Sequence, residues 1–115
     1  MNFTIYHNPR CRISRQVLDM LQSAGYNVDI VEYLKNPLKE EELTVLLQKL
    51  NIKPEELIRK NEALYKKNFR GKNFTEKEWI KILKENPVLI ERPIVVKGHK
   101  AIVCRPPERI YDFIK

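Results

Sequence analysis

Cys11 is the residue best placed to do chemistry in this chain of 115 residues. It follows a short apolar run and stands where a helical pattern begins. Unpaired backbone N–H groups and the helix dipole stabilise a negative charge at the start of a helix, and a thiolate is favoured there. Arg10 and Arg12 flank it and add positive potential. The pattern predicts a nucleophilic thiol; the alternative is a buried cysteine that serves as a small apolar side chain.

The residues after Cys11 restrict the redox chemistry open to it. The run from Cys11 to Ser14 has the spacing of a CxxC motif with serine at the second position. A disulfide cannot close within this run, so a disulfide on Cys11 requires Cys104 or another molecule. Cys104 ends an apolar run, where we expect a buried and inert thiol, with a resolving thiol as the alternative.

Four further residues could bind an anion or stabilise a thiolate. His7 lies four positions before Cys11 and would favour its thiolate, or is an ordinary loop histidine. Arg59, Arg92 and Arg105 stand at the ends of predicted elements, and a guanidinium group binds oxyanions through two parallel hydrogen bonds. Taken singly, each arginine also fits a solvated surface charge. Sequence spacing does not show that the three converge.

The elements that must hold these residues follow from apolar periodicity. A strand is predicted over residues 3–6, a helix from Cys11 to Ala24 that Gly25 ends, and a second strand over 28–31. A strand, helix and strand in about 30 residues form a right-handed parallel crossover.

The middle of the chain is predicted to be helical. One helix begins near Glu40, a short one runs from Pro54 to Ile58, and another runs from a capping box at residues 75–78 to Glu85. Residues 66–73, with Gly71 and several basic side chains, are predicted to be an exposed connector.

The C-terminal part predicts a hairpin and a last helix. Apolar strands over residues 94–96 and 101–103 flank a four-residue loop, 97–100, and the final helix starts at Pro106. The order is β-α-β, a helical block, then β-β-α. We therefore predict a single α/β domain over residues 1–115, with a helical insertion at about 36–88 between the second and third strands.

Composition excludes some classes of protein and partner. Apolar residues make up 43% and charged residues 32%, which is typical of a globular chain and not of a disordered one. No apolar run reaches the roughly 18 residues that span a bilayer, and no signal pattern opens the chain. We expect a cytoplasmic protein without a membrane partner. The net charge of +7 favours anions, but its spread along the chain argues against nucleic acid. No Cys and His spacing predicts a metal site.

Several motifs together resemble a known family. In chain order they are IYHNPRCRISRQ, VEYLKNP, ELIRKNE, NPVLIERPIVV and CRPPE. At these spacings the sequence resembles the glutaredoxin-coupled arsenate reductases over essentially its whole length. The resemblance implies a thioredoxin/glutaredoxin-like fold with a mixed four-stranded sheet, in agreement with the element order above.

The resemblance also implies a reaction. The Cys11 thiolate would attack the arsenic of arsenate, glutathione would form a mixed disulfide, and glutaredoxin would resolve it with release of arsenite. Three family arginines that hold the oxyanion match Arg59, Arg92 and Arg105. Glutathione enters as a co-substrate, and no tightly bound cofactor or metal is expected.

Further site residues come from the same resemblance. The family histidine that helps to ionise the cysteine matches His7, and the active-site serine matches Ser14. The Arg92–Pro93 bond matches the cis-proline position of the fold, which places Pro93 near the thiol.

Two other functions stay open at this point. One is a regulatory adaptor that binds the transcription machinery, and the other is a glutathione-dependent thiol-disulfide oxidoreductase. The three arginines favour arsenate reduction, with arsenate or a similar oxyanion, glutathione and glutaredoxin as partners. We expect the protein to act as a monomer.

Overall fold

The computed structural model describes residues 2–115, and the chain divides into two compact units. The first consists of the residues up to Asn36 together with Arg92–Lys115, and the second is Pro37–Glu91. The predicted helical insertion, about 36–88, falls almost entirely in the second unit.

The first unit contains a four-stranded sheet in the order β2-β1-β3-β4. Strand β1 (Asn2–Tyr6) pairs in parallel with β2 (Asn27–Val31) and antiparallel with β3 (Ile94–Lys97), which in turn pairs antiparallel with β4 (Lys100–Val103). The mixed sheet and the parallel β-α-β crossover confirm the predicted fold class.

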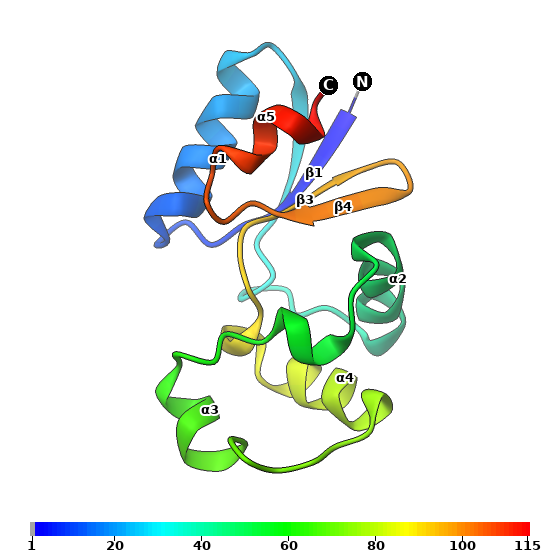
Figure 1. Ribbon diagram of the computed structural model, residues 1–115. Coiled ribbons are helices and arrows are strands. Elements are labelled where there is room, and N and C mark those ends of the chain that lie inside the picture. Colours follow the sequence, from blue (N-terminus) through cyan, green and yellow to red (C-terminus); the bar gives the residue numbers. More distant parts are fainter. Residues whose placement is uncertain (1) are drawn as a thin grey trace. The chain divides into compact units, whose positions relative to one another are not determined.

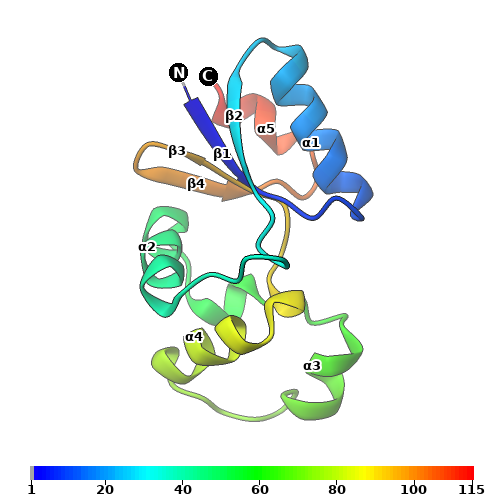
Figure 2. The same ribbon diagram turned by 180° about the vertical axis from the view of Figure 1, so that it is seen from behind.

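One face of this sheet is covered by α1 (Arg12–Ser23) and α5 (Arg109–Phe113) (Figures 1 and 2). Successive strand side chains point to opposite faces, so Phe3 and Ile5 of β1 point to the same side. They pack with Val17 of α1 and Ile110 of α5 in one buried cluster. The cluster fixes α1, and with it the start of the helix at Cys11, against the sheet.

The second unit is helical, and α4 (Glu76–Glu85) lies at its centre. It packs against α2 (Glu40–Leu50) and two 3-10 turns, η1 (Pro54–Leu57) and η2 (Pro87–Leu89). Its two buried residues, Trp79 and Leu83, lie four positions apart and therefore on one helical face. The predicted capping box is confirmed, because the Thr75 hydroxyl accepts from the Glu78 N–H at 3.1 Å and the Glu78 carboxylate accepts from the Thr75 N–H at 2.8 Å.

Three local predictions were wrong. Residues 66–73 are not only a connector, because α3 (Ala63–Asn68) extends into them; this helix buries no residue, so no apolar stripe marks it. The hairpin loop has two residues and not four, since Lys97 pairs with Lys100. The last helix begins three positions after Pro106, following a tight turn.

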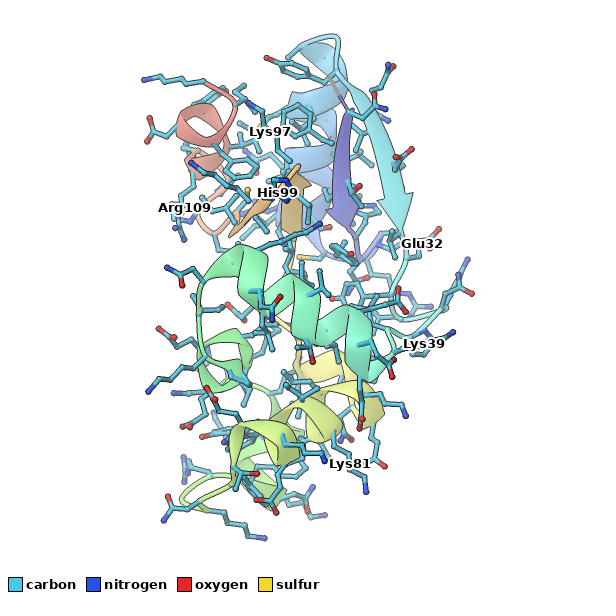
Figure 3. All side chains as sticks on the ribbon, turned by 90° about the vertical axis from the view of Figure 1, so that its right-hand side faces the viewer. Glu32, Lys39, Lys81, Lys97, His99 and Arg109 are labelled. Carbon is cyan, nitrogen blue, oxygen red and sulfur yellow. The ribbon has the colours of Figure 1, made fainter. Side chains whose placement is uncertain are left out.

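Basic side chains come from many separate elements. Figure 3 labels Lys81 on α4, Lys97 at the end of β3 and Arg109 on α5. The Nζ of Lys97 lies 5.8 Å from the centre of the Phe3 ring, a cation–π distance. The positive charge is therefore distributed over elements and not confined to one of them.

Candidate active site

Cys11 lies at the N-cap of α1, where the loop after β1 turns into the helix. The loop is held by its own hydrogen bonds: the Cys11 N–H donates to the Asn8 carbonyl at 3.0 Å, and the Arg10 N–H donates to Asn8 Oδ1 at 3.0 Å. The Arg15 guanidinium reaches back from the helix to the Pro9 carbonyl at 2.9 Å. These contacts fix the position from which the Cys11 side chain leaves the backbone.

A buried polar group lies under this loop. The Ser14 side chain is fully buried, with 0% exposure, and its Oγ lies 2.6 Å from His7 Nδ1. The same Oγ accepts the Asn8 N–H at 3.1 Å. The three groups join the end of β1, the loop and the first turn of α1, so they hold the start of the helix against the sheet.

The surroundings of His7 favour its neutral form. Burial lowers its pKa, the nearby carboxylate of Glu32 opposes this, and the positive charge of Arg15 adds to the lowering. A neutral Nδ1 without a proton accepts a hydrogen bond, and we assign the Ser14 hydroxyl as its donor. His7 therefore contacts the site through Ser14, whereas the sequence suggested an effect of the histidine on the thiolate itself.

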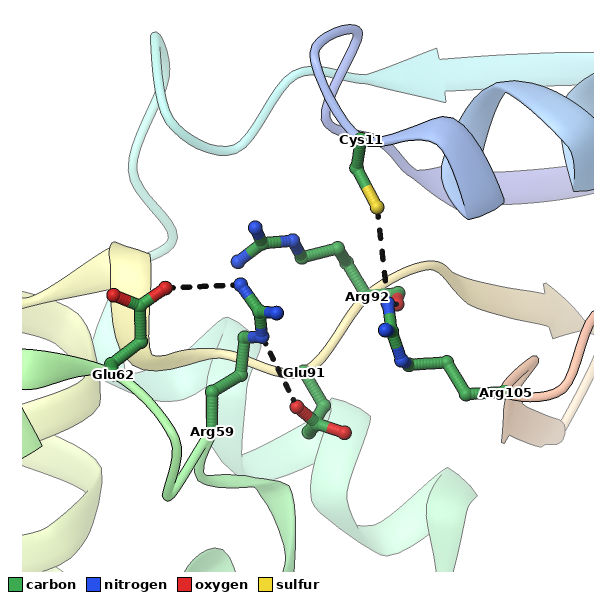
Figure 4. A network of polar contacts seen from close by, with 6 residues as sticks. All are labelled: Cys11, Arg59, Glu62, Glu91, Arg92 and Arg105. Atoms are coloured by element: carbon green, nitrogen blue, oxygen red, sulfur yellow. Dashed lines mark hydrogen bonds and ion pairs between the residues drawn. The ribbon is translucent and has the colours of Figure 1, made fainter.

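Arg92 and Arg105 lie beside the Cys11 sulfur. Nη1 of Arg105 is 3.8 Å from Sγ and also donates to the Arg92 carbonyl at 3.1 Å (Figure 4). Partial burial raises the pKa of the Cys11 thiol, but the backbone N–H of Ser14 and the two arginines outweigh it, so the pKa lies below the ordinary value. The fold thus brings together three residues that are up to 94 positions apart.

Two prolines follow these arginines directly. The Arg92–Pro93 and Arg105–Pro106 peptide bonds are both cis. The Cys104 N–H donates to the Pro93 carbonyl at 2.9 Å, which ties the start of β3 to the end of β4. The backbones that carry the two arginines are therefore joined to each other next to the thiol.

Cys104 differs sharply from Cys11, although both are free thiols. Cys104 is completely buried, and burial raises its pKa to about 12 against an opposing effect of the Arg109 charge. A thiol in this state is neutral and unreactive at physiological pH.

Arg59 belongs to the second unit, where it follows η1 and Ile58. Its Nη1 donates to Glu62 Oε1 at 3.0 Å, and its Nε lies 3.3 Å from Glu91 Oε1 (Figure 4). Sequence reasoning singled out the arginine and missed both carboxylates, since neither has a distinctive motif.

Asn8 was also missed by the sequence analysis. It is buried, with 6% exposure, and holds the loop through its side chain and its backbone. The available signal was the tendency of asparagine to bond to backbone N–H groups two residues ahead.

Metal and membrane features are absent from the part of the chain that the structure describes. Within residues 2–115 no three His, Cys, Asp or Glu side chains gather as metal ligands would. Over the same residues, no helix combines the length and apolar character that crossing a bilayer requires.

Comparison with known proteins places this geometry in a family. A profile of the ArsC family matches residues 6–113. The arsenate reductase of Acidiphilium multivorum is 37% identical over 98% of this chain and 81% of its own length. The uncharacterized protein YfgD of Escherichia coli K12 is 40% identical, over 96% of this chain and 94% of its own.

Solved structures agree with the sequence comparisons. The arsenate reductase from Vibrio cholerae is 36% identical, covers 97% of both chains and superposes with a TM-score of 0.92. The match of the family profile and the similarity over nearly the full length lead to one conclusion: the chain belongs to the ArsC family.

Proposed function

We propose that this protein is an arsenate reductase that uses glutathione and glutaredoxin as reductants. The observation that carries the proposal is the half-buried Cys11 thiol with Arg105 at 3.8 Å and Arg92 beside it. Membership of the ArsC family, whose relatives include proteins named arsenate reductase, supports the same activity.

The proposed reaction begins with attack of the Cys11 thiolate on arsenic. A new S–As bond forms, and one arsenate oxygen leaves as water after protonation. Arsenate is a tetrahedral anion, so a thiolate that approaches it meets repulsion. Two guanidinium groups beside the sulfur offset this repulsion and stabilise the negative charge that grows in the transition state.

The second stage consumes glutathione. Its thiol and Cys11 together supply the two electrons that take arsenic from As(V) to As(III), and they end as a mixed disulfide while arsenite leaves. Glutaredoxin then takes the glutathionyl group and restores the Cys11 thiol. Ser14 stands at the position of a second CxxC cysteine, so no disulfide within the motif competes with this route.

The remaining residues have proposed supporting roles. His7 orients Ser14, whose backbone N–H favours the thiolate. The resemblance to family members suggests that Arg59 adds a third guanidinium group toward the oxyanion and that Pro93 borders the glutathione site. We further propose that the protein acts as a monomer in the cytoplasm, without a tightly bound cofactor.

A coupled assay tests the proposal. Purified protein is incubated with arsenate, glutathione and glutaredoxin, and arsenite is measured with each component omitted in turn. We expect arsenite only when all are present. Cys11→Ser should abolish it, because a hydroxyl is a far weaker nucleophile than a thiolate. Cys104→Ser is the matched control and should retain most activity.

Two outcomes would overturn this function. The first is full activity in Cys11→Ser with loss of activity in Cys104→Ser, which would identify Cys104 as the nucleophile. The second is that no arsenite forms under any condition and that the Cys11 thiol has an ordinary pKa. This result would contradict an enzymatic function. Retention of RNA polymerase by the immobilised protein in that second case would favour the regulatory adaptor.

A further inference from the structure

Arg59 is held by two carboxylates from different directions. Nη1 donates to Glu62 at 3.0 Å, and Nε pairs with Glu91 at 3.3 Å (Figure 4). The three side chains are 20%, 28% and 27% exposed, so the group is partly shielded from water. A guanidinium group with two anchors loses most of its freedom to rotate.

The backbones that carry these groups are also joined. The Arg59 N–H donates to the Leu89 carbonyl at 2.7 Å, and the Glu91 N–H donates to the Leu57 carbonyl at 2.8 Å. Between them Ile58 and Ile90 form an antiparallel bridge, and both are buried. The Glu62 N–H closes a turn onto the Arg59 carbonyl at 3.1 Å.

Stability alone gives little reason for this arrangement. Partly exposed ion pairs contribute little to folding, because solvent screens them and ordering long side chains costs entropy. A carboxylate near an arginine also weakens its attraction for an anion. The benefit that remains is orientation, since a fixed guanidinium fork pays less entropy when it binds a ligand.

We propose that Glu62 and Glu91 are positioning residues that aim the Arg59 guanidinium at a tetrahedral oxyanion of the arsenate class. Guanidinium carries five N–H donors, and the two carboxylates take one each, so three remain for the oxyanion. This inference rests on the proposed role of Arg59 in oxyanion binding.

The test measures oxyanion binding through the thiol. Cys11 is alkylated with iodoacetamide at increasing arsenate, and the concentration that halves the rate is recorded. We expect Glu62→Ala/Glu91→Ala to raise that concentration three- to tenfold. The single Glu→Gln variants keep an oxygen acceptor and should lie between the wild type and the double variant. Glu85→Ala removes an exposed carboxylate of α4 and should match the wild type.

A double-mutant cycle separates positioning from a general structural effect. In an Arg59→Ala background, removing the two carboxylates should not weaken arsenate binding any further, because there is no guanidinium group left for them to orient. Thermal melting of each variant checks folding. If the double alanine variant does not fold, the same cycle is run with the two glutamine variants.

The outcomes distinguish this inference from the function on which it rests. The positioning role would be overturned by either of two results. One is that loss of both carboxylates weakens arsenate binding equally with and without Arg59. The other is that their loss leaves arsenate binding as tight as in the wild type. If Arg59→Ala alone leaves arsenate protection unchanged, the proposed role of Arg59 fails instead. If arsenate does not protect the wild-type thiol at all, the proposed function itself is contradicted.

Discussion

Opposing effects act on the pKa of the Cys11 thiol. Partial burial raises the thiol pKa because it removes water from the thiolate. The Ser14 N–H and the guanidinium groups of Arg92 and Arg105 lower it, because they favour the charged form, and they prevail. The balance is set by residues from the first helix and from both ends of the β3–β4 hairpin.

This balance predicts how Cys11 reacts as a function of pH. Its alkylation by iodoacetamide should have a midpoint below ~8.5, the value of a free thiol, and Arg105→Ala should move the midpoint upward. Arg70→Ala, which changes an exposed arginine of the second unit, is the control and should leave the midpoint in place. Identical midpoints in the Arg105 variant and the wild type would contradict the role of Arg105.

The lowered pKa of His7 predicts that this residue makes the folded protein less stable as the pH falls. Its folded pKa is lowered by burial, so the unfolded chain takes up the proton first as the pH falls. Stability is therefore complete above the ordinary histidine pKa of about 6.5 and is lost below it. His7→Asn keeps an acceptor near the place of Nδ1 but cannot titrate.

Urea unfolding at pH 7.5 and 5.5 measures this effect. The wild type should lose more unfolding free energy between the two pH values than His7→Asn, because its unfolded chain takes up a proton on the histidine that asparagine cannot take up. Other groups titrate equally in both proteins and cancel in the comparison. An equal loss would mean that His7 is not held neutral in the folded state.

At the residue scale, the sequence singled out candidate residues but did not predict their contacts. Cys11 could be singled out because its signal is local: a strand, a turn and a helix start within ten residues. The contact between Cys11 and Arg105 joins positions 94 apart, and no periodicity reports it. Glu91 was missed for the same reason, since it lies 32 positions from the arginine that it holds. Glu62 lies only three positions from Arg59 and was missed because no distinctive motif marks it.

At the element scale, helices with an apolar stripe were predictable and a helix without one was not. Helices α1, α2 and α4 carry apolar stripes; the predicted bounds of α1 and α4 agree closely with the observed ones, and α2 begins at Glu40 as predicted. Helix α3 buries no residue, so only backbone propensity marks it, and propensity is a weak signal. The hairpin was predicted with too long a loop because its last pair, Lys97 and Lys100, is polar.

The cap of α4 gives a prediction about stability. Thr75→Ala should lower the unfolding free energy by about 1 kcal/mol, because the Glu78 N–H loses its side-chain acceptor. Thr75→Ser keeps the oxygen and should lose much less. Thr44→Ala makes the same change at an exposed position inside α2, where the hydroxyl only bonds back to the Glu40 carbonyl. Urea unfolding of the three variants compares them directly, and equal losses at both threonines would contradict the cap.

At the scale of the whole molecule, the family match extends over both units. The matched residues, 6–113, include the sheet that carries Cys11 and the helical unit that carries Arg59. The resemblance found in the sequence is therefore confirmed for the chain as a whole, and the two units belong to one family pattern. Charge is the other property of the whole molecule, and it raises the question whether +7 itself attracts arsenate.

The site arginines should matter far more than the total charge. Lys66, Lys67 and Lys72 are exposed, and changing all three to glutamine takes the net charge from +7 to +4. Exposed charges act through water and are screened within about 8 Å at physiological salt. We therefore expect the triple variant to change kcat/KM for arsenate less than twofold at 0.15 M NaCl, whereas Arg105→Ala should lower it on the order of 10²-fold.

A salt titration makes this comparison decisive. Lowering the ionic strength to 0.01 M extends the screening length to about 30 Å, so any effect of the three lysines should grow there and vanish again at 0.15 M. The loss caused by Arg105→Ala should persist at both salt concentrations, because its guanidinium lies in a partly buried position against the sulfur. If the lysine variant loses as much activity as the arginine variant at 0.15 M, arsenate is attracted by the overall field of the protein and the arginines beside Cys11 lose their special role.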